Sequence, residues 1–131
     1  MAYKRKRPPL DPCPVESVFR IVAGKWKVRV LYLLSLEDLA FGELRHSIGG
    51  IRQQVLSSLL QDLIADGAIW RAAHASSERA TYGLTGRGRE LVVLLTPLAE
   101  WGSKLLAEQG VVWEQPAPRR NPQVDHPVPG P

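Results

Sequence analysis

The feature that most constrains the fold is a pair of helical patterns on either side of two adjacent glycines, Gly49 and Gly50. The first pattern begins at Phe41 and places Leu44 and Ile48 on the inward side of a short helix. The glycines end that helix because they adopt the left-handed backbone that other residues resist. In the second pattern, apolar residues at helical spacing share one face: Val55, Leu56, Leu59, Leu60, Leu63 and Ile64. Two amphipathic helices joined by a tight turn are therefore predicted.

Two further helices are predicted ahead of this pair. Pro14 suits the first turn of a helix, and apolar residues then recur at the i, i+3, i+4 and i+7 positions from Val15 to Val22. Gly24 ends that helix. An apolar-rich helix is predicted over residues 26–34, with a loop over residues 35–39.

A hairpin and a long helical region are predicted after it. Residues 68–73 and 81–84 have the pattern of two strands around a polar tip at 76–79. Thr85 is a suitable N-cap for a last helical region over residues 86–109. Pro97 lies inside that region and predicts a kink, or a break into two helices, near Thr96.

Composition places one ordinary domain between two tails. The chain has 131 residues and 44% hydrophobic content, which is enough for one buried core. We predict a basic flexible arm over residues 1–10, a single domain over 11–113 and a Pro-rich disordered tail over 114–131. The chain has 17 Lys plus Arg and 13 Asp plus Glu, an excess of four positive charges. The four basic residues at positions 4–7 account for the whole of that excess. Overall basicity is therefore weak evidence for a nucleic-acid partner.

The cysteine content and the hydropathy pattern exclude several classes of protein. The one cysteine, Cys13, rules out an intrachain disulfide framework and a multi-thiolate zinc site, so we expect a reducing cytoplasm and no metal or other cofactor. The sequence shows no signal-peptide pattern and no apolar run long enough to span a bilayer. Cys13 with His46 or His74 could form a nucleophile and base, but no oxyanion, phosphate-loop or metal-ligand motif accompanies them. We predict that the protein is not an enzyme.

The order helix, glycine turn, helix and hairpin predicts a mainly α fold with a small β-hairpin, a winged helix-turn-helix. In that arrangement the second helix enters the DNA major groove and the hairpin contacts the DNA backbone. The residues predicted to read bases are Arg52, Gln53, Gln54, Ser57, Ser58 and Gln61. The residues predicted to contact phosphate are Arg71, His74 and Arg79 in the hairpin, with Lys25, Lys27, Arg45 and His46 on the flanks. A plain solvated helix face and ordinary surface arginines are the alternative interpretations.

Seven short motifs in this order resemble the HxlR-type regulators, a bacterial winged helix-turn-helix family related to the MarR type. They are Cys-Pro-Val-Glu at 13–16, Gly-Lys-Trp-Lys at 24–27, Phe-Gly-Glu-Leu-Arg at 41–45, Gly-Ile at 50–51, Asp-Gly at 66–67, Tyr-Gly-Leu-Thr at 82–85 and Glu-Trp-Gly at 100–102. The resemblance covers about residues 12–107 and implies a homodimeric, sequence-specific transcription factor, with repression as the family habit. The chain departs from the family in three places. Arg52 replaces a capping Ser or Thr, the wing lacks the usual Pro-Pro, and Pro97 is in an uncommon position.

A homodimer is also indicated by the apolar content of the C-terminal helical region, which exceeds what a small core can cover. The residues predicted at the dimer interface are Val15, Phe19, Leu94, Leu98, Trp101 and Leu105. A two-fold dimer would place two recognition helices about 34 Å apart and read a near-palindromic operator. The alternative is that these residues cover their own domain.

Cys13 lies at the start of the first predicted helix, where the helix dipole stabilises a thiolate. In relatives of this kind a cysteine in this motif serves some members as a sensor of oxidants or electrophiles, so Cys13 is a candidate redox sensor and an electrophile or other small molecule a candidate effector. A packed or capping cysteine is the alternative. For the whole chain, the alternative function is a winged-helix module that binds proteins and not DNA.

Overall fold

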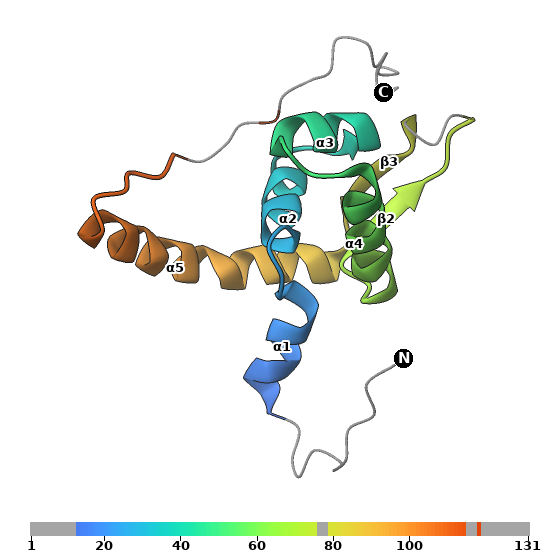
Figure 1. Cartoon of the computed structure of the whole chain (residues 1–131). Coiled ribbons are helices and arrows are strands. Elements are labelled where there is room, and N and C mark those ends of the chain that lie inside the picture. The colour runs from blue at the N-terminus through green and yellow to red at the C-terminus, as the bar shows by residue number, and fades with distance from the viewer. Residues whose placement is uncertain (1–12, 76–78, 115–117, 119–131) are drawn as a thin grey trace, which may run out of the picture.

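The structure, a computed structural model, describes residues 13–75, 79–114 and 118 (Figure 1). Its elements, in chain order, are α1 (Pro14–Val22), α2 (Lys27–Leu36), β1 (Leu39–Ala40), α3 (Phe41–Ile48), α4 (Gln53–Ala65), β2 (Ile69–Ala72), β3 (Thr81–Leu84) and α5 (Gly86–Glu108). The predicted arm at 1–10 and the hairpin tip at 76–78 lie outside the described residues. So does the predicted tail, apart from residues 114 and 118.

A three-stranded antiparallel sheet, in the order β1, β3, β2, forms the wing and its base. Tyr82 in the central strand pairs with Leu39 on one side and with Arg71 on the other. The predicted mainly α fold with a small hairpin is confirmed, and the third strand is an addition to it. The prediction of a loop over 35–39 was wrong at both ends, because Ser35 and Leu36 belong to α2 and Leu39 belongs to β1.

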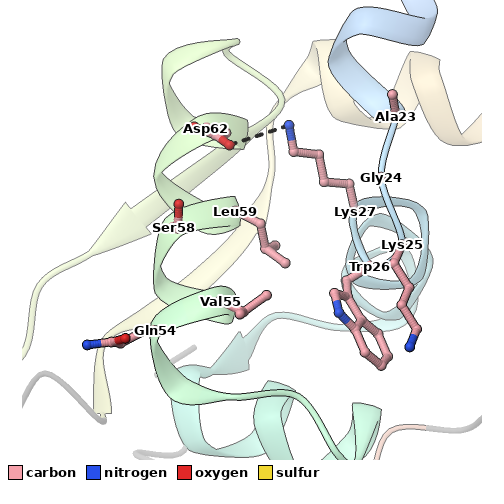
Figure 2. A pocket seen from close by; sticks show the side chains of 10 residues that line it. All are labelled: Ala23, Gly24, Lys25, Trp26, Lys27, Gln54, Val55, Ser58, Leu59 and Asp62. Carbon is pink, nitrogen blue, oxygen red and sulfur yellow. Dashed lines mark ion pairs between the residues drawn. The ribbon is translucent and has the colours of Figure 1, made fainter. Parts of the chain in front are cut away.

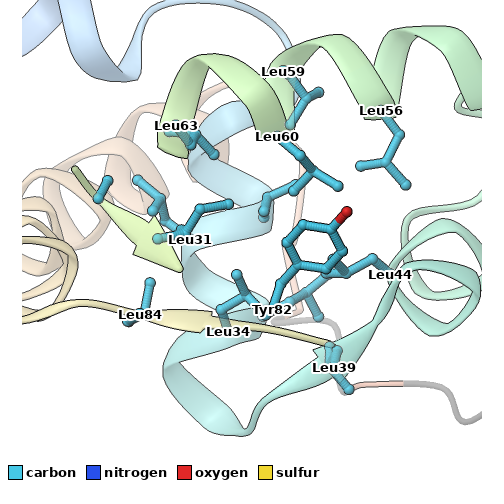
Figure 3. Packing of buried hydrophobic residues seen from close by; sticks show 14 of the residues in the cluster. Leu31, Leu34, Leu39, Leu44, Leu56, Leu59, Leu60, Leu63, Tyr82 and Leu84 are labelled. Atoms are coloured by element: carbon cyan, nitrogen blue, oxygen red, sulfur yellow. The ribbon is translucent and has the colours of Figure 1, made fainter. Parts of the chain in front are cut away.

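The core lies where α2, α3, α4 and the sheet meet (Figure 3). Its fully buried large side chains come from all of these elements: Val30, Leu31, Leu33, Leu39, Leu44, Leu56, Leu60 and Leu63. Removing a leucine side chain from such a site typically costs about 2–5 kcal/mol of folding free energy. This core therefore fixes the orientation of α4, which carries the predicted recognition residues.

The buried face of α4 is narrower than the sequence pattern indicated. Leu56, Leu59, Leu60 and Leu63 are buried, but Val55 is 40% exposed. The apolar residue at the other end of the pattern, Ile64, is 36% exposed. Both residues lie at the edges of this apolar stripe, where Val55 lines one hollow beside α4 and Ile64 lines another.

The last helix, α5, is capped as predicted. The hydroxyl of Thr85 accepts a hydrogen bond from the amide of Gly88 at 3.1 Å and donates one to the carbonyl of Gly67 at 2.5 Å. The predicted break at Pro97 is absent, because α5 runs without interruption through it. Proline removes one backbone donor, and here the helix turn is exposed, so water can satisfy the carbonyl that is left without a partner.

Helix α1 reaches the core only through its C-terminal end. Val22 is buried and Val18 and Ile21 pack partly against the core, while the rest of α1 projects away from the other elements (Figure 1). Among the residues that the structure describes, no helix is long and apolar enough to cross a membrane.

Candidate nucleic-acid interface

The turn between α3 and α4 has the backbone that the two glycines predict. Gly49 and Gly50 have φ angles of 67° and 73°, which favour glycine. Ile51 is buried beneath the turn, and the side chain of Arg45 donates a hydrogen bond from Nε to its carbonyl at 3.4 Å. This contact fixes the separation of α3 and α4, so Arg45 holds the turn as well as carrying a charge near it.

The outer face of α4 carries the predicted base-reading residues. Arg52, Gln53, Gln54, Ser58 and Gln61 are exposed and Ser57 is half-buried. Arg52 occupies the N-cap position without a side-chain hydrogen bond to the helix, as its departure from a capping serine or threonine implies. The first turn of α4 contains no acidic side chain, so no carboxylate there competes with the amide groups of Gln53 and Gln54.

A hollow of about 320 Å³ joins α4 to the sheet. Gln53, Ser57 and Gln61 line one wall, and Arg71 of β2 lines the other. The Nε of Arg71 donates a hydrogen bond to the hydroxyl of Tyr82 at 3.3 Å, which steadies the exposed guanidinium beside α4. The structure thus brings three of the predicted base-reading residues together with one predicted phosphate contact.

A second hollow, of about 370 Å³, lies on the opposite side of α4, against the loop that joins α1 to α2 (Figure 2). Val55 and Leu59 point into it from α4, whereas the side chain of Gln54 points away toward the outer face. Lys27 is 16% exposed, and its ammonium lies 3.6 Å from a carboxylate oxygen of Asp62. This ion pair ties the start of α2 to α4.

Lys25 forms the exposed rim of the same hollow. Its ammonium lies 4.6 Å from the ring centroid of Trp26, and the guanidinium of Arg29 lies 5.5 Å from that centroid. Trp26 therefore lies beside two cations, of which Lys25 lines the hollow next to α4. Lys25 was predicted from the sequence and Arg29 was not, because the contact of Arg29 with Trp26 depends on how the start of α2 folds.

The wing presents its remaining predicted residues on the surface. His74 and Arg79 are exposed on either side of the tip, and 76–78 lie outside the described residues. Neither residue lines the two hollows beside α4.

The residues predicted at a dimer interface are all exposed. On α5, Leu94 is 59%, Leu98 is 56% and Trp101 is 62% exposed, and Leu105 continues the same stripe. On α1, Val15 and Phe19 are more than half exposed. A contiguous apolar surface of this kind is unusual on a monomer in water.

Cys13 occupies the N-cap position of α1 with an extended backbone, as predicted, and its thiol is exposed. Its carbonyl accepts hydrogen bonds from the amide and the hydroxyl of Ser17, at 3.0 and 3.1 Å. The contacts with Ser17 involve only the backbone of Cys13, so they leave its sulfur accessible from solvent.

The match to a family model decides the classification. Residues 21–110 match the model of the HxlR-like helix-turn-helix, which covers more than half of the chain. The chain belongs to the HxlR family. This HxlR-type chain is 35% identical over 104 residues to an uncharacterized HTH-type transcriptional regulator of Halalkalibacterium halodurans, covering 78% of this chain and 92% of the relative. It is also 35% identical over 91 residues to the HTH-type regulator YdzF of Bacillus subtilis, covering 68% and 84% of the two chains.

Solved structures agree with that classification. The redox regulator HypR in its reduced form superposes with a TM-score of 0.67 at 31% sequence identity, covering 74% of the HxlR-type chain and 99% of HypR. The oxidized form of HypR superposes with a TM-score of 0.63 at 32% identity, covering 70% and 96%. The chain is thus a transcriptional regulator of winged helix-turn-helix type.

Proposed function

We propose that this protein is a sequence-specific DNA-binding repressor that acts as a homodimer on a near-palindromic operator. Helix α4 enters the major groove, where Gln53, Gln54, Ser57, Ser58 and Gln61 read base edges and Arg52 contacts a base or a phosphate at the N-terminal turn. The observation that carries this proposal is the outer face of α4. It exposes amide and hydroxyl groups between two hollows, one containing Arg71 and the other bordered by Lys25.

The cations predicted to contact phosphate fall into two groups, those that are exposed and face DNA and those whose contacts within the protein position α4. Arg71, steadied by Tyr82, and Lys25, beside Trp26, are exposed and face the duplex on the two sides of α4. His74 and Arg79 extend the contact along the wing. Lys27 and Arg45 act mainly by positioning α4, since one is paired with Asp62 and the other supports the turn at Ile51.

The homodimer is proposed from the exposed apolar stripe of α5 together with the exposed face of α1. Covering Leu94, Leu98, Trp101 and Leu105 with a second copy removes them from water at about 25 cal/mol for each Å² of apolar surface. A two-fold axis across α5 would present two α4 helices to one face of the duplex.

Mobility shift with full-length protein tests the proposal. The DNA is the region upstream of the protein's own operon, and the control is a duplex of shuffled sequence and equal composition. A shift that favours the upstream region and weakens steeply with salt supports a DNA-binding regulator. Absence of a shift at low salt would contradict it and favour a protein-interaction module.

Replacing Arg71 by alanine is expected to weaken DNA binding about equally on operator and shuffled duplex and to lower the slope of log affinity against log salt by about one. The reason is that a phosphate contact contributes charge but no sequence information. Lys104→Ala is the matched control, because it removes one exposed cation from the C-terminal part of α5, outside the two hollows beside α4. Anisotropy titrations over several salt concentrations measure both effects. Equal slopes for the two variants would contradict the assignment of Arg71.

Cys13→Ser is expected to bind the operator normally but to lose any change in affinity on treatment with diamide or a quinone. The proposal of redox sensing is supported by the exposed thiol at a helix N-terminus and by the likeness to HypR, a redox regulator. Operator titrations with and without diamide, on wild type and variant, check the result. An undiminished response in Cys13→Ser would exclude Cys13 as the sensor.

A further inference from the structure

A cavity of about 340 Å³ lies between α2 and α5, away from the outer face of α4. This volume falls within the range of small-molecule sites, about 300–1,000 Å³. Val28 of α2 and Leu95 of α5 contribute apolar walls, and Trp113, which lies beyond the end of α5, also lines the cavity. The cavity is therefore lined by described residues that are far apart in sequence.

Four hydroxyl-bearing residues line this cavity, Tyr32, Ser35, Thr96 and Ser103, and the last three already donate their hydrogens to backbone carbonyls. Thr96 donates its hydroxyl hydrogen to the carbonyl of Val92 at 2.8 Å, and Ser103 donates its own to the carbonyl of Ala99 at 2.9 Å. Ser35, on α2, does the same to the carbonyl of its own helix turn at 2.5 Å. A hydroxyl has one hydrogen, so each of these oxygens can only accept a further bond.

Two charged side chains complete the lining, Glu100 on α5 and Arg29 on α2. Within the described residues no ion pair joins them, and the guanidinium of Arg29 is directed to the ring of Trp26. The Glu100 carboxylate therefore adds a charged acceptor to the three hydroxyl oxygens.

The cavity and the proposed dimer surface occupy different faces of α5. At 3.6 residues per turn, the cavity residues Val92, Leu95, Thr96, Ala99 and Ser103 are centred roughly 150° around the helix from the exposed stripe. That stripe consists of Leu94, Leu98, Trp101 and Leu105. A second copy seated on the stripe leaves the cavity open to small molecules.

We propose that this cavity binds a small apolar molecule that carries a hydrogen-bond donor, an organic amine with one ring being the best match. The ring packs between Val28, Leu95 and the indole of Trp113, and the ammonium donates to Glu100 and the hydroxyl oxygens. Because the cavity joins α2 to the helix of the proposed dimer, an occupant shifts the two α4 helices relative to one another. This regulatory consequence rests on the proposed function, whereas the binding site does not.

Titration of the full-length protein with 2-phenylethylamine, followed by amide NMR in the absence of DNA, tests the proposal. We expect the shifts to centre on Ser35, Thr96 and Ala99, and 3-phenylpropanoate, which has the same ring and the opposite charge, to bind far more weakly. Glu100→Gln is expected to weaken amine binding about tenfold, because a charge-assisted hydrogen bond becomes a neutral one.

Ala99→Trp, which fills the cavity, is expected to abolish amine binding, and Ala107→Trp on the same helix outside the cavity is the matched control. The proposal is overturned if the amine and the carboxylate bind alike, if neither binds, or if the amine still binds to Ala99→Trp. It is also overturned if Ala99→Trp alone dissociates the dimer, since a second copy would then cover this groove. Operator affinity is measured on the same samples to distinguish failure of the amine site from failure of the proposed function. If the amine does not bind but the operator does, only the amine site is ruled out.

Discussion

Arginine in place of both Leu98 and Trp101 is expected to convert the proposed dimer into a folded monomer and to weaken operator binding by about 100-fold or more. Both side chains are more than half exposed in the monomer, so their replacement costs its core nothing. In a dimer the four arginines would lie buried and unpaired against each other, which is strongly unfavourable. The loss of affinity follows because each half-site is then bound separately, without the effective concentration that the dimer provides.

Val93→Arg is the matched control for this prediction. Val93 is 70% exposed and lies on another side of α5, so the dimer should persist. Sedimentation velocity measures the oligomeric state, circular dichroism the fold and anisotropy the operator affinity. A double variant that remains dimeric would show that the α5 stripe is not the interface.

Gly88→Ala is expected to lower the free energy of unfolding by about 2–3 kcal/mol. A Cβ at this position would collide with the backbone carbonyl oxygen of Ala68 and press on the side chain of Leu84. The same carbonyl accepts a hydrogen bond from the amide of Thr85 at 3.1 Å, so the substitution also disturbs the cap of α5. The start of α5 and the base of the wing would have to separate.

Gly86→Ala serves as the control, because nothing lies within 4 Å of a Cβ there. We expect its stability to change by no more than about 0.5 kcal/mol. Urea unfolding of both variants measures the difference. Equal stabilities would mean that α5 and the wing base do not approach as closely as the structure has them.

The helices could be predicted from the sequence because their signals are local. Thr85 and the glycines at 49 and 50 mark helix ends by their own backbone and hydrogen-bonding preferences, and the structure confirms all three. Strand β1 was missed because two residues show no alternation and are held by Tyr82 and Thr81, far along the chain. Leu36 was missed as a helical residue because it is half exposed and adds nothing to the inward pattern.

Part of the candidate site was also predictable, because its residues on α4 follow from a local pattern in the sequence. The residues on the outer face of α4 follow from its buried face, which the spacing of Leu56, Leu59, Leu60 and Leu63 defines. The neighbours of that face do not follow from spacing. The contact of Arg71 with Tyr82 and the pairing of Lys27 with Asp62 depend on how the sheet and α2 pack against α4. Sequence alone could not separate cations available to DNA from those that position the helix.

Selection of binding sites from a random duplex pool, with wild type and with Gln54→Ala/Gln61→Ala, tests the central claim most directly. The wild type is predicted to enrich an inverted repeat whose half-site centres are about one helical turn apart, as two α4 helices across a dimer require. The variant is predicted to lose preference at positions within each half-site while keeping weak, salt-sensitive binding. No enriched sequence for the wild type, or the same enriched sequence for the variant, would contradict the assignment of α4 as the helix that reads DNA.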